Sequence, residues 1–385
     1  MGIKILHGDC KEKLQSLCSN SINTCITSPP YWGLRDYGTA TWEGGDEGCD
    51  HKEEKGFNKQ NLAALADKFD PHKNPRNPNA YDTGKDVAIP NFKNQCGKCG
   101  AVRKDSQLGL EETPEDFVEN LVEVFREVKR VLRDDGTLWL NLGDSYAMSS
   151  IRGGNKKFSG NVGAHNHYDK SIKKGKRNIP EGIKPKDLIG IPWRVAFALQ
   201  ADGWYLRQDI IWHKPNPMPE SVTDRCTKAH EYIFLLSKSP KYYFDNEAIK
   251  EDAKQTIKSN RVGKKERVDY RPLGTIKDVV TGSDKTTVRT NKRNKRSVWT
   301  VTTKPFKGAH FATFPMDLID PCVLAGCPIH GTVLDPFGGS GTTAEVANAH
   351  NRNAVLIELN EEYIEIAKER LAPGGDLFTE IEVVS

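Results

Sequence analysis

The sequence predicts an α/β fold with a doubly wound sheet, and three observations support this. Short apolar strands alternate with amphipathic helical stretches along the chain. A strand, a glycine-rich turn and a helix start follow one another over residues 332–349. With 385 residues, the chain can bury a sizeable core as one large domain or two ordinary ones. Because no apolar run approaches the ~18 residues of a membrane span, we expect a cytoplasmic protein with no membrane partner.

The elements of the first half follow from apolar spacing and from breaker residues. Thr113 followed by Pro114 is typical of a helix start, and apolar residues then recur at intervals of three and four. We expect Asp135-Gly136 to end this helix, and the polar residues 40–98 to form an inserted loop. The other expected elements are strands over 4–7, 22–27 and 137–142 and a helix over 10–17.

The second half shows the same alternation. A glycine-rich turn over residues 336–343 separates a strand over 332–334 from a helix that begins at Thr343. Residues 151–186 are expected to form a loop. The further expected elements are helices over 192–200 and 361–371 and strands over 204–214, 232–237 and 353–359.

The charge of the chain is segregated. The net charge is only +4, but residues 151–186 carry 10 basic and 2 acidic side chains, and residues 250–307 carry 17 and 6. The remainder of the chain therefore has a net charge of −15. Two basic segments on an acidic body favour a polyanionic partner. The competing interpretation is a solvated or disordered surface, and for residues 151–186 the sequence does not separate the two.

Nine cysteines, an odd number, indicate metal ligands and free thiols rather than a secreted disulfide framework. Residues 49–51 (Cys-Asp-His) and 96–99 (Cys-Gly-Lys-Cys) form two pairs separated by 44 residues. Four nitrogen and sulfur ligands suit tetrahedral structural zinc, which would tether the insert. The expected ligands are Cys49, His51, Cys96 and Cys99. The alternative is a set of unrelated reduced thiols and a surface histidine.

Residues 333–343 read Val-Leu-Asp-Pro-Phe-Gly-Gly-Ser-Gly-Thr-Thr. Glycines let the backbone turn tightly and let a ligand approach, and the free N–H groups of a helix start favour electron-rich ligand atoms. Glu358 ends the next expected strand, 23 residues after Asp335, where an adenosine cofactor has its ribose hydroxyls bound. No Lys-Ser/Thr pair follows the glycines, which excludes a Walker loop. The pattern favours a nucleoside cofactor over a purely structural turn.

The segment Ser28-Pro29-Pro30-Tyr31 follows an apolar strand, at the end of the sheet where ligands bind in open α/β folds. Two prolines stiffen this turn and remove two amide donors. The Ser28 hydroxyl and the Pro29 carbonyl can accept hydrogen bonds from a substrate NH₂ group. Tyr31, with Trp32, supplies flat faces for stacking a base. The alternative is a proline turn packed with two aromatic residues.

Together, these motifs resemble the β group of S-adenosylmethionine-dependent DNA amino-methyltransferases. Residues 26–31 are similar to the catalytic motif IV in the form typical of N4-cytosine enzymes, and residues 335–342 to the cofactor motif I. Residues 310–315 resemble motif X, and Gly8-Asp9 resembles the motif III acid. The resemblance covers residues 4–50, 105–250 and 308–371. It implies a Rossmann-like class I methyltransferase fold, permuted so that the catalytic motif precedes the cofactor motif.

The resemblance also implies roles for individual residues. The implied catalytic residues are Ser28, Pro29, Pro30 and Tyr31. The implied S-adenosylmethionine-binding residues are Asp9, Phe314, Asp335, Phe337, Gly338, Gly339, Gly341, Thr342 and Glu358. Residues 250–307 lie where the family places its target-recognition region. The phosphate contacts expected there are Lys292, Arg293, Lys295 and Arg296.

The resemblance implies a chain with a catalytic half and a cofactor half, and with segments inserted within and between them. The divisions are 1–48 as the start of the catalytic half, 49–100 as an insert with a zinc knuckle, 101–249 as the catalytic core with the basic loop 151–186, 250–307 as the target-recognition region and 308–385 as the cofactor half. Double-stranded DNA is the implied partner, in the cytoplasm of a prokaryotic or phage-infected cell. A homodimer and a companion restriction endonuclease are further partners that the resemblance raises.

The implied function is methylation of cytosine N4 in duplex DNA, by base flipping and direct in-line attack. Adenine N6 enzymes share this chemistry and usually carry Asp or Asn where Ser28 stands, so serine favours cytosine. A cytosine-C5 enzyme would need a nucleophilic cysteine, but Pro321-Cys322 precedes the cofactor motif, and we expect Cys322 to pack in the core. A non-catalytic DNA-binding protein on the same core is disfavoured by the intact motifs. A nicotinamide-dependent oxidoreductase would leave the Ser-Pro-Pro-Tyr turn without a role.

Overall fold

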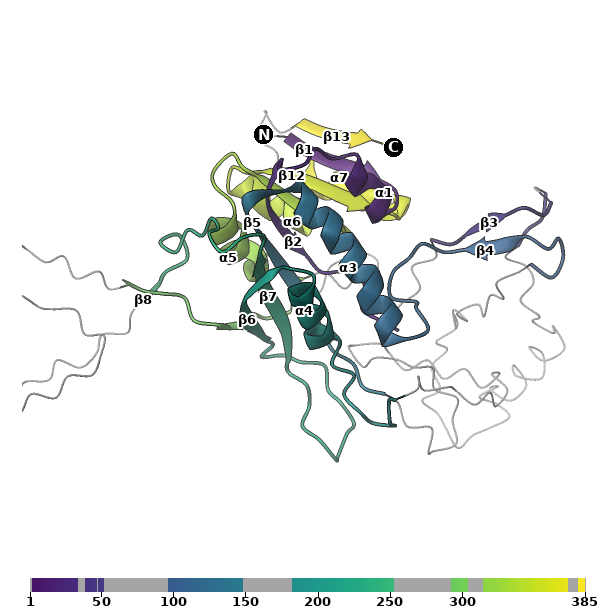
Figure 1. Ribbon diagram of the computed structural model, residues 1–385, viewed down its shortest axis with the longest axis horizontal. Coiled ribbons are helices and arrows are strands. Elements are labelled where there is room, and N and C mark those ends of the chain that lie inside the picture. The colour runs from purple at the N-terminus through teal and green to yellow at the C-terminus, as the bar shows by residue number, and fades with distance from the viewer. Residues whose placement is uncertain are drawn as a thin grey trace, which may run out of the picture.

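The computed structural model describes residues 2–33, 39–46, 48–51, 96–147, 182–252, 292–303, 314–372 and 380–384. Within these ranges, nine strands form one sheet with helices on both faces (Figure 1). Their spatial order is β10 (Val298–Thr300), β6 (Tyr205–His213), β7 (His230–Ser237), β5 (Leu132–Leu142), β2 (Ile22–Thr27), β11 (Thr332–Asp335), β12 (Asn353–Glu358), β1 (Gly2–His7) and β13 (Glu380–Val384). The predicted doubly wound α/β fold is confirmed.

The sheet is parallel except for β7, which runs antiparallel to both of its neighbours, β5 and β6. The chain continues from β11 outward to β12, and from β2 outward to β5 in the opposite direction. The strand order therefore reverses between β2 and β11, where Leu334 pairs with Cys25. In open α/β sheets, such a switch point creates the crevice in which ligands bind.

Two helical layers bury the two faces of the sheet. One layer comprises α1 (Cys10–Gln15), α3 (Pro114–Val131) and α4 (Ile191–Ala201), and the other comprises α5 (Met316–Gly326), α6 (Thr342–Ala349) and α7 (Glu361–Leu371). Phe117 and Phe125 of α3 are fully buried in the first layer. Thr113 caps α3 as predicted, accepting a hydrogen bond from the Asp116 backbone N–H at 3.1 Å. No helix of the described ranges is long and apolar enough to cross a membrane.

Several elements differ from the sequence-based expectations. Asp135 and Gly136 lie inside β5 and do not end α3, because β5 already begins at Leu132, paired with Ile22. The helix α5 was not expected, since Pro321 lies inside it and removes one backbone hydrogen bond. Its apolar residues bury against the sheet and offset this loss.

Several short strands were also not expected from the sequence. β3 (Thr41–Glu43), near the start of the expected loop 40–98, pairs antiparallel with β4 (Val102–Lys104), just after that loop, and their hairpin extends away from the sheet in Figure 1. Outside the main sheet, β8 (Glu251–Asp252) pairs with β9 (Lys292–Arg293). The edge strand β10 comes from within residues 250–307 and joins the main sheet beside β6.

Candidate active site

The carboxyl ends of neighbouring strands form one edge of the sheet, and the predicted catalytic and cofactor residues follow these ends. Asp9 comes just after β1, Glu358 ends β12, Asp335 ends β11 and Ser28 follows β2. These four strands are adjacent in the order β1, β12, β11 and β2. Residues that are hundreds of positions apart in the sequence are thus brought to one site at the switch point.

The Ser-Pro-Pro-Tyr loop at residues 28–31 is half-buried to buried and is anchored on both sides. Trp32 is only 5% exposed, and its Nε1–H donates to the Glu111 carbonyl at 2.9 Å. The Gly33 N–H donates to the Gly109 carbonyl at 2.8 Å. Trp32 is therefore a core residue that fixes the loop, and the expectation that it offers a stacking face is wrong.

Tyr31 is oriented by contacts at its hydroxyl and at its ring edge. Its hydroxyl donates to Glu231 Oε2 at 2.8 Å and lies 3.4 Å from Asn141 Oδ1. Glu231, which is buried at the start of β7, also forms an ion pair with Lys214. A Cβ added to Gly143 would lie 2.5 Å from Tyr31 Cε2, so the glycine permits the ring to lie against the end of β5. The direction of the Tyr31 ring is thus set by the protein itself.

Asp335 joins the catalytic strand to the glycine-rich turn. It is 2% exposed, and its Oδ1 accepts hydrogen bonds from Thr27 Oγ1 at 2.6 Å and from the Phe337 N–H at 3.1 Å. Its Oδ2 accepts from Thr343 Oγ1 at 2.6 Å. Burial raises the pKa of Asp335 to about 6, against the opposing effect of the two threonine hydroxyls. These internal bonds give Asp335 a positioning role between β2 and the glycine-rich turn, and its expected contact with a cofactor stays a prediction.

The glycine-rich turn requires glycine for two different reasons. A Cβ on Gly338 would lie 2.9 Å from Leu356 Cβ, so the turn passes too close to β12 for a side chain. Gly339 and Gly341 have φ values of +51° and +82°, in the left-handed region that favours glycine. Among the described residues other than its chain neighbours, a Cβ on Gly339 would meet no atom closer than 3.9 Å, which leaves room for a ligand beside this residue.

Two carboxylates at neighbouring strand ends hold the loops around this turn. Glu358 accepts hydrogen bonds from the N–H groups of Gly339 and Asn360, each at 2.8 Å. Burial raises the pKa of Glu358 above its ordinary value. Asp9 caps α1 by accepting from the Lys11 N–H at 2.8 Å. Asp9 Oδ1 also accepts from the Glu12 N–H at 3.3 Å. Asp9 Oδ2 and both oxygens of Glu358 have a further lone pair, so both residues can still accept hydrogen bonds from ligand hydroxyls.

Arg370 of α7 clamps the far side of the turn. Its Nη1 donates to Thr342 Oγ1 at 2.8 Å and to Ser340 Oγ at 3.0 Å, and it forms an ion pair with Glu345. The hydroxyl of Thr342, a predicted cofactor contact, is therefore engaged by the protein. The other two predicted contacts, Phe314 and Phe337, pack half-buried against the hydrophobic core. Residues 310–313 lie outside the described ranges.

The predicted DNA contacts lie in β9 and just after it, where Glu251 forms ion pairs with three of them. The carboxylate oxygens of Glu251 lie 3.4 Å from Arg293 Nε, 3.4 Å from Arg296 Nε and 3.9 Å from Lys295 Nζ. Phosphate groups would have to compete with this carboxylate for three of the four predicted contacts, the fourth being Lys292. Most of the two basic segments, 151–186 and 250–307, falls outside the described residues.

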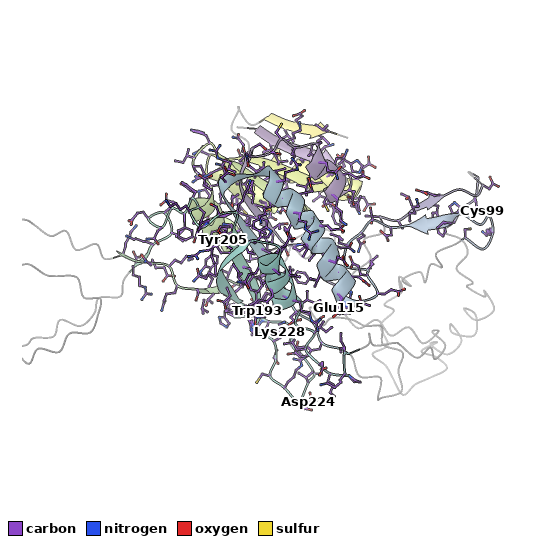
Figure 2. The ribbon with its side chains drawn as sticks, in the orientation of Figure 1. Cys99, Glu115, Trp193, Tyr205, Asp224 and Lys228 are labelled. Carbon is purple, nitrogen blue, oxygen red and sulfur yellow. The ribbon has the colours of Figure 1, made fainter. Side chains whose placement is uncertain are left out.

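Two predictions about cysteines remain: a metal-binding cluster in the insert, and the packing of Cys322 in the core. The structure brings Cys49, His51, Cys96 and Cys99 together at the β3–β4 hairpin, apart from the sheet edge, and Figure 2 labels Cys99 there. Cys322 is 1% exposed in the core, as expected, and burial raises the pKa of its thiol. A buried neutral thiol does not suit the nucleophile of a C5 enzyme.

Sequence reasoning missed the side chains that support the catalytic loop. Asn141 interrupts the apolar end of β5 and Glu231 directly precedes the apolar run of β7, and this contrast is a signal that could have singled out both buried residues. Lys214 and Arg370 carry no such signal, because a single basic residue after a strand or at the end of a helix is ordinary on a protein surface.

Comparison with known proteins shows to which family the chain belongs. The family described as DNA methylase matches residues 22–369. The chain belongs to this DNA methylase family. It is 41% identical over 368 residues to the Type II methyltransferase M.SmaI of Serratia marcescens, covering 96% of this chain and 90% of that protein. It is 39% identical over 373 residues to M.Cfr9I of Citrobacter freundii, covering 96% and 88%.

Among solved structures, the PvuII DNA methyltransferase (cytosine-N4-specific) matches this DNA methylase with a TM-score of 0.51 and 14% identity. The match covers 99% of this chain and 96% of that one. At this low identity the likeness shows that the two proteins share a fold. The expected Rossmann-like methyltransferase fold and the β-group membership agree with these comparisons.

The residues at the sheet edge fit S-adenosylmethionine, the cofactor of this family. Space is open at Gly339, directly beside the Glu358 carboxylate that the family pattern assigns to the ribose. Helix α6 begins at Gly341 without a side-chain cap, so its first N–H groups remain for electron-rich ligand atoms. In this arrangement Glu358 and Asp9 would bind hydroxyl or amino groups, and the glycine turn would pass along the cofactor.

Proposed function

We propose that this DNA methylase transfers a methyl group from S-adenosylmethionine to an exocyclic amino nitrogen in duplex DNA, and that its target is cytosine N4. The observation that carries the proposal is the 2.6 Å hydrogen bond from Thr27 Oγ1 to Asp335 Oδ1. It fastens the end of the catalytic strand to the start of the glycine turn. The acceptors for an amino group and the candidate cofactor turn therefore lie at adjacent strand ends.

The preset direction of Tyr31 supports a base-binding role. A target base must leave the duplex stack before its amino group can enter a pocket, and extrusion costs a few kcal/mol. Stacking on an aromatic side chain recovers about 1–3 kcal/mol of that cost. Because Glu231 and Gly143 hold Tyr31 in place beforehand, little of this gain is lost to ordering the side chain on binding.

The role of Ser28 and Pro29 follows from the electronic structure of the amino group. Its lone pair is delocalised into the base ring, so the nitrogen is a poor nucleophile. Hydrogen bonds from the amino hydrogens to Ser28 Oγ and the Pro29 carbonyl favour the sp³ form and stabilise the positive charge that develops on nitrogen. Bound S-adenosylmethionine supplies the methyl group. The stiff diproline turn keeps these acceptors in place, and no covalent enzyme intermediate is required.

The choice of cytosine N4 over adenine N6 rests on Ser28. Serine is short and offers a hydroxyl oxygen as acceptor, where the adenine enzymes of the family usually carry Asp or Asn. Adenine N6 methylation is the alternative with the same chemistry. The names of the Type II methyltransferase relatives support a site-specific enzyme. A companion restriction endonuclease, and the reading of the DNA target by residues 250–307, stay predictions.

The target base can be tested by expressing the protein in a host without DNA methylases and digesting the plasmid to nucleosides. Mass spectrometry should find N4-methylcytosine, and a Ser28→Ala control should lower its amount strongly without removing cofactor binding. Finding N6-methyladenine instead would refute the cytosine assignment. If no modified nucleoside appeared, a non-catalytic DNA-binding role would replace the proposed enzyme.

A further inference from the structure

The β3–β4 hairpin carries a Cys₃His cluster that the methyl-transfer site does not use. We propose that Cys49, His51, Cys96 and Cys99 bind one structural zinc ion that fastens the two ends of the insert at residues 52–95. The ligand atoms of these four residues all lie within 4.8 Å of one another. Within the described ranges this is the one such group of metal-ligating side chains found.

The separations inside the cluster match the edges of a zinc tetrahedron. With Zn–S bonds of about 2.3 Å and Zn–N bonds of about 2.0–2.1 Å, two sulfur ligands lie about 3.8 Å apart, and sulfur and nitrogen about 3.6 Å apart. Cys49 Sγ and Cys96 Sγ are 3.9 Å apart. Cys99 Sγ and His51 Nδ1 are 3.5 Å apart. Two of the six separations thus match the edges of the tetrahedron, and the others are all within 4.8 Å, so small side-chain adjustments suffice for a four-coordinate ion.

The backbone around the Cys-x-x-Cys pair forms a tight knuckle. The Gly100 N–H donates to the Cys96 carbonyl at 2.9 Å, and Gly100 has a left-handed φ of +76°. This turn brings the Cys99 sulfur back to within 4.8 Å of the Cys96 sulfur, so both ligands of the pair face the same point.

Neighbouring residues shape the other side of the cluster. A Cβ on Gly45 would lie 2.7 Å from Cys99 Sγ, so the glycine lets the chain pass directly against this ligand. The His51 ring stacks on Trp42, with ring centroids 4.7 Å apart and an interplanar angle of 24°. This contact fixes the direction of the imidazole, as surrounding residues do at metal sites.

The types of ligand atom indicate which metal ion the cluster would bind. Three thiolates and an imidazole in tetrahedral arrangement suit zinc, whereas calcium and magnesium require oxygen ligands. All four positions are filled by protein, which is typical of a structural site and leaves no place for a reacting water. A disulfide is not an alternative in this structure, because the cysteines are free thiols.

Zinc would fasten the two ends of the insert, at His51 and Cys96, to each other. The four ligands come together only in the folded chain, with 44 residues between His51 and Cys96, so the free energy of zinc binding adds to the free energy of folding. The base of the hairpin is tied by a 3.2 Å hydrogen bond from Thr39 Oγ1 to Asp105 Oδ1. The chain then reaches Gly109, which binds the end of the Ser-Pro-Pro-Tyr loop through Gly33.

The proposal can be tested by measuring the zinc content of the full-length protein, purified without chelator or added metal and dialysed before mass spectrometry. About one zinc ion per chain is expected. Cys99→Ser should lose most of this zinc, whereas Cys226→Ser, a control at an exposed free cysteine, should keep it. Absence of stoichiometric zinc from the wild-type protein, or equal zinc in both variants, would overturn the proposal.

X-ray absorption of the wild-type protein provides a second test that does not depend on how well a variant folds. The expected first shell has three sulfur atoms at about 2.3 Å and one nitrogen at about 2.0–2.1 Å. A shell dominated by oxygen or nitrogen would indicate zinc bound elsewhere and would refute the assignment. Neither measurement uses methyl transfer, so the outcome is independent of the proposed function.

Discussion

The buried ion pair between Lys214 and Glu231 supports Tyr31 of the Ser-Pro-Pro-Tyr loop, and the effect of removing it can be predicted quantitatively. The two side chains are 13% and 6% exposed, so neither charge is well solvated. Breaking such a pair leaves one buried charge uncompensated and typically costs about 3–5 kcal/mol, whereas replacing both partners is often close to neutral. We therefore expect Glu231→Gln and Lys214→Met each to lower the free energy of unfolding by about 3 kcal/mol.

The double variant separates pairing from simple side-chain loss. Met can keep the packing of Lys214 on the Trp212 ring, which lies 4.1 Å from Lys214 Nζ, and Gln can still accept from the Tyr31 hydroxyl. The variant with both substitutions should therefore be more stable than the sum of the single changes predicts, by a coupling free energy of about 2 kcal/mol. Urea unfolding followed by tryptophan fluorescence measures all three variants.

An exposed ion pair gives the matched control. Lys368 and Glu365 pair on the surface of α7, with 38% and 61% of their side chains exposed, so Glu365→Gln should change stability by less than about 1 kcal/mol. Additive effects of Glu231→Gln and Lys214→Met, or single effects as small as this control, would refute the argument that the pair is desolvated and coupled.

Three further predictions concern the sheet edge. Gly143→Ala places a Cβ 2.5 Å from Tyr31 Cε2, and the displaced ring should lower kcat roughly 10- to 100-fold in a radiolabelled methyl-transfer assay while cofactor affinity stays unchanged. Gly339→Asp adds a charge and bulk beside Glu358 and should weaken cofactor binding by about tenfold or more in calorimetry; unaltered affinity would contradict the assignment of the turn. The pKa of Asp335 is raised from 3.8 to about 6 by burial, so its contribution to stability is present below pH 3.8 and is lost as the pH rises through 6. Relative to Asp335→Asn, the wild type should lose on the order of 1 kcal/mol of unfolding free energy between about pH 5 and about pH 7.5, and a pH-independent difference would show that the carboxylate is not desolvated.

Elements governed by local signals were predictable from the sequence. The helix α3 begins at Pro114 because Thr113 caps it and because its apolar residues form one buried face, and both facts are visible in the sequence. The start of β5 was not predictable in this way. Asp135 and Gly136 are local breakers, but the Lys238 N–H donates to the Gly136 carbonyl, and this distant pairing keeps the segment extended.

The candidate site likewise combines motifs that the sequence predicts with contacts that only the fold creates. The Ser-Pro-Pro-Tyr loop and the glycine turn are short motifs whose chemistry depends on consecutive residues, so each could be recognised separately. Their contact through Thr27 and Asp335 joins residues 308 positions apart, and nothing local to either motif indicates it. The internal use of the Asp335 carboxylate, and the burial of Trp32, likewise depend on which distant residues surround them.

The sequence by itself predicted most strands of the main sheet and most of the helices that cover it, the two motifs, the acid at the end of β12 and the two Cys/His pairs. These features depend on hydrogen bonding, backbone freedom and side-chain chemistry over a few consecutive residues. The tertiary structure decided that Glu231, paired with Lys214, binds Tyr31, that Arg370 contacts the glycine turn, and that the two halves of the Cys₃His cluster meet. Such contacts form between segments far apart in the chain, because packing the sheet and its helices fixes which side chains become neighbours.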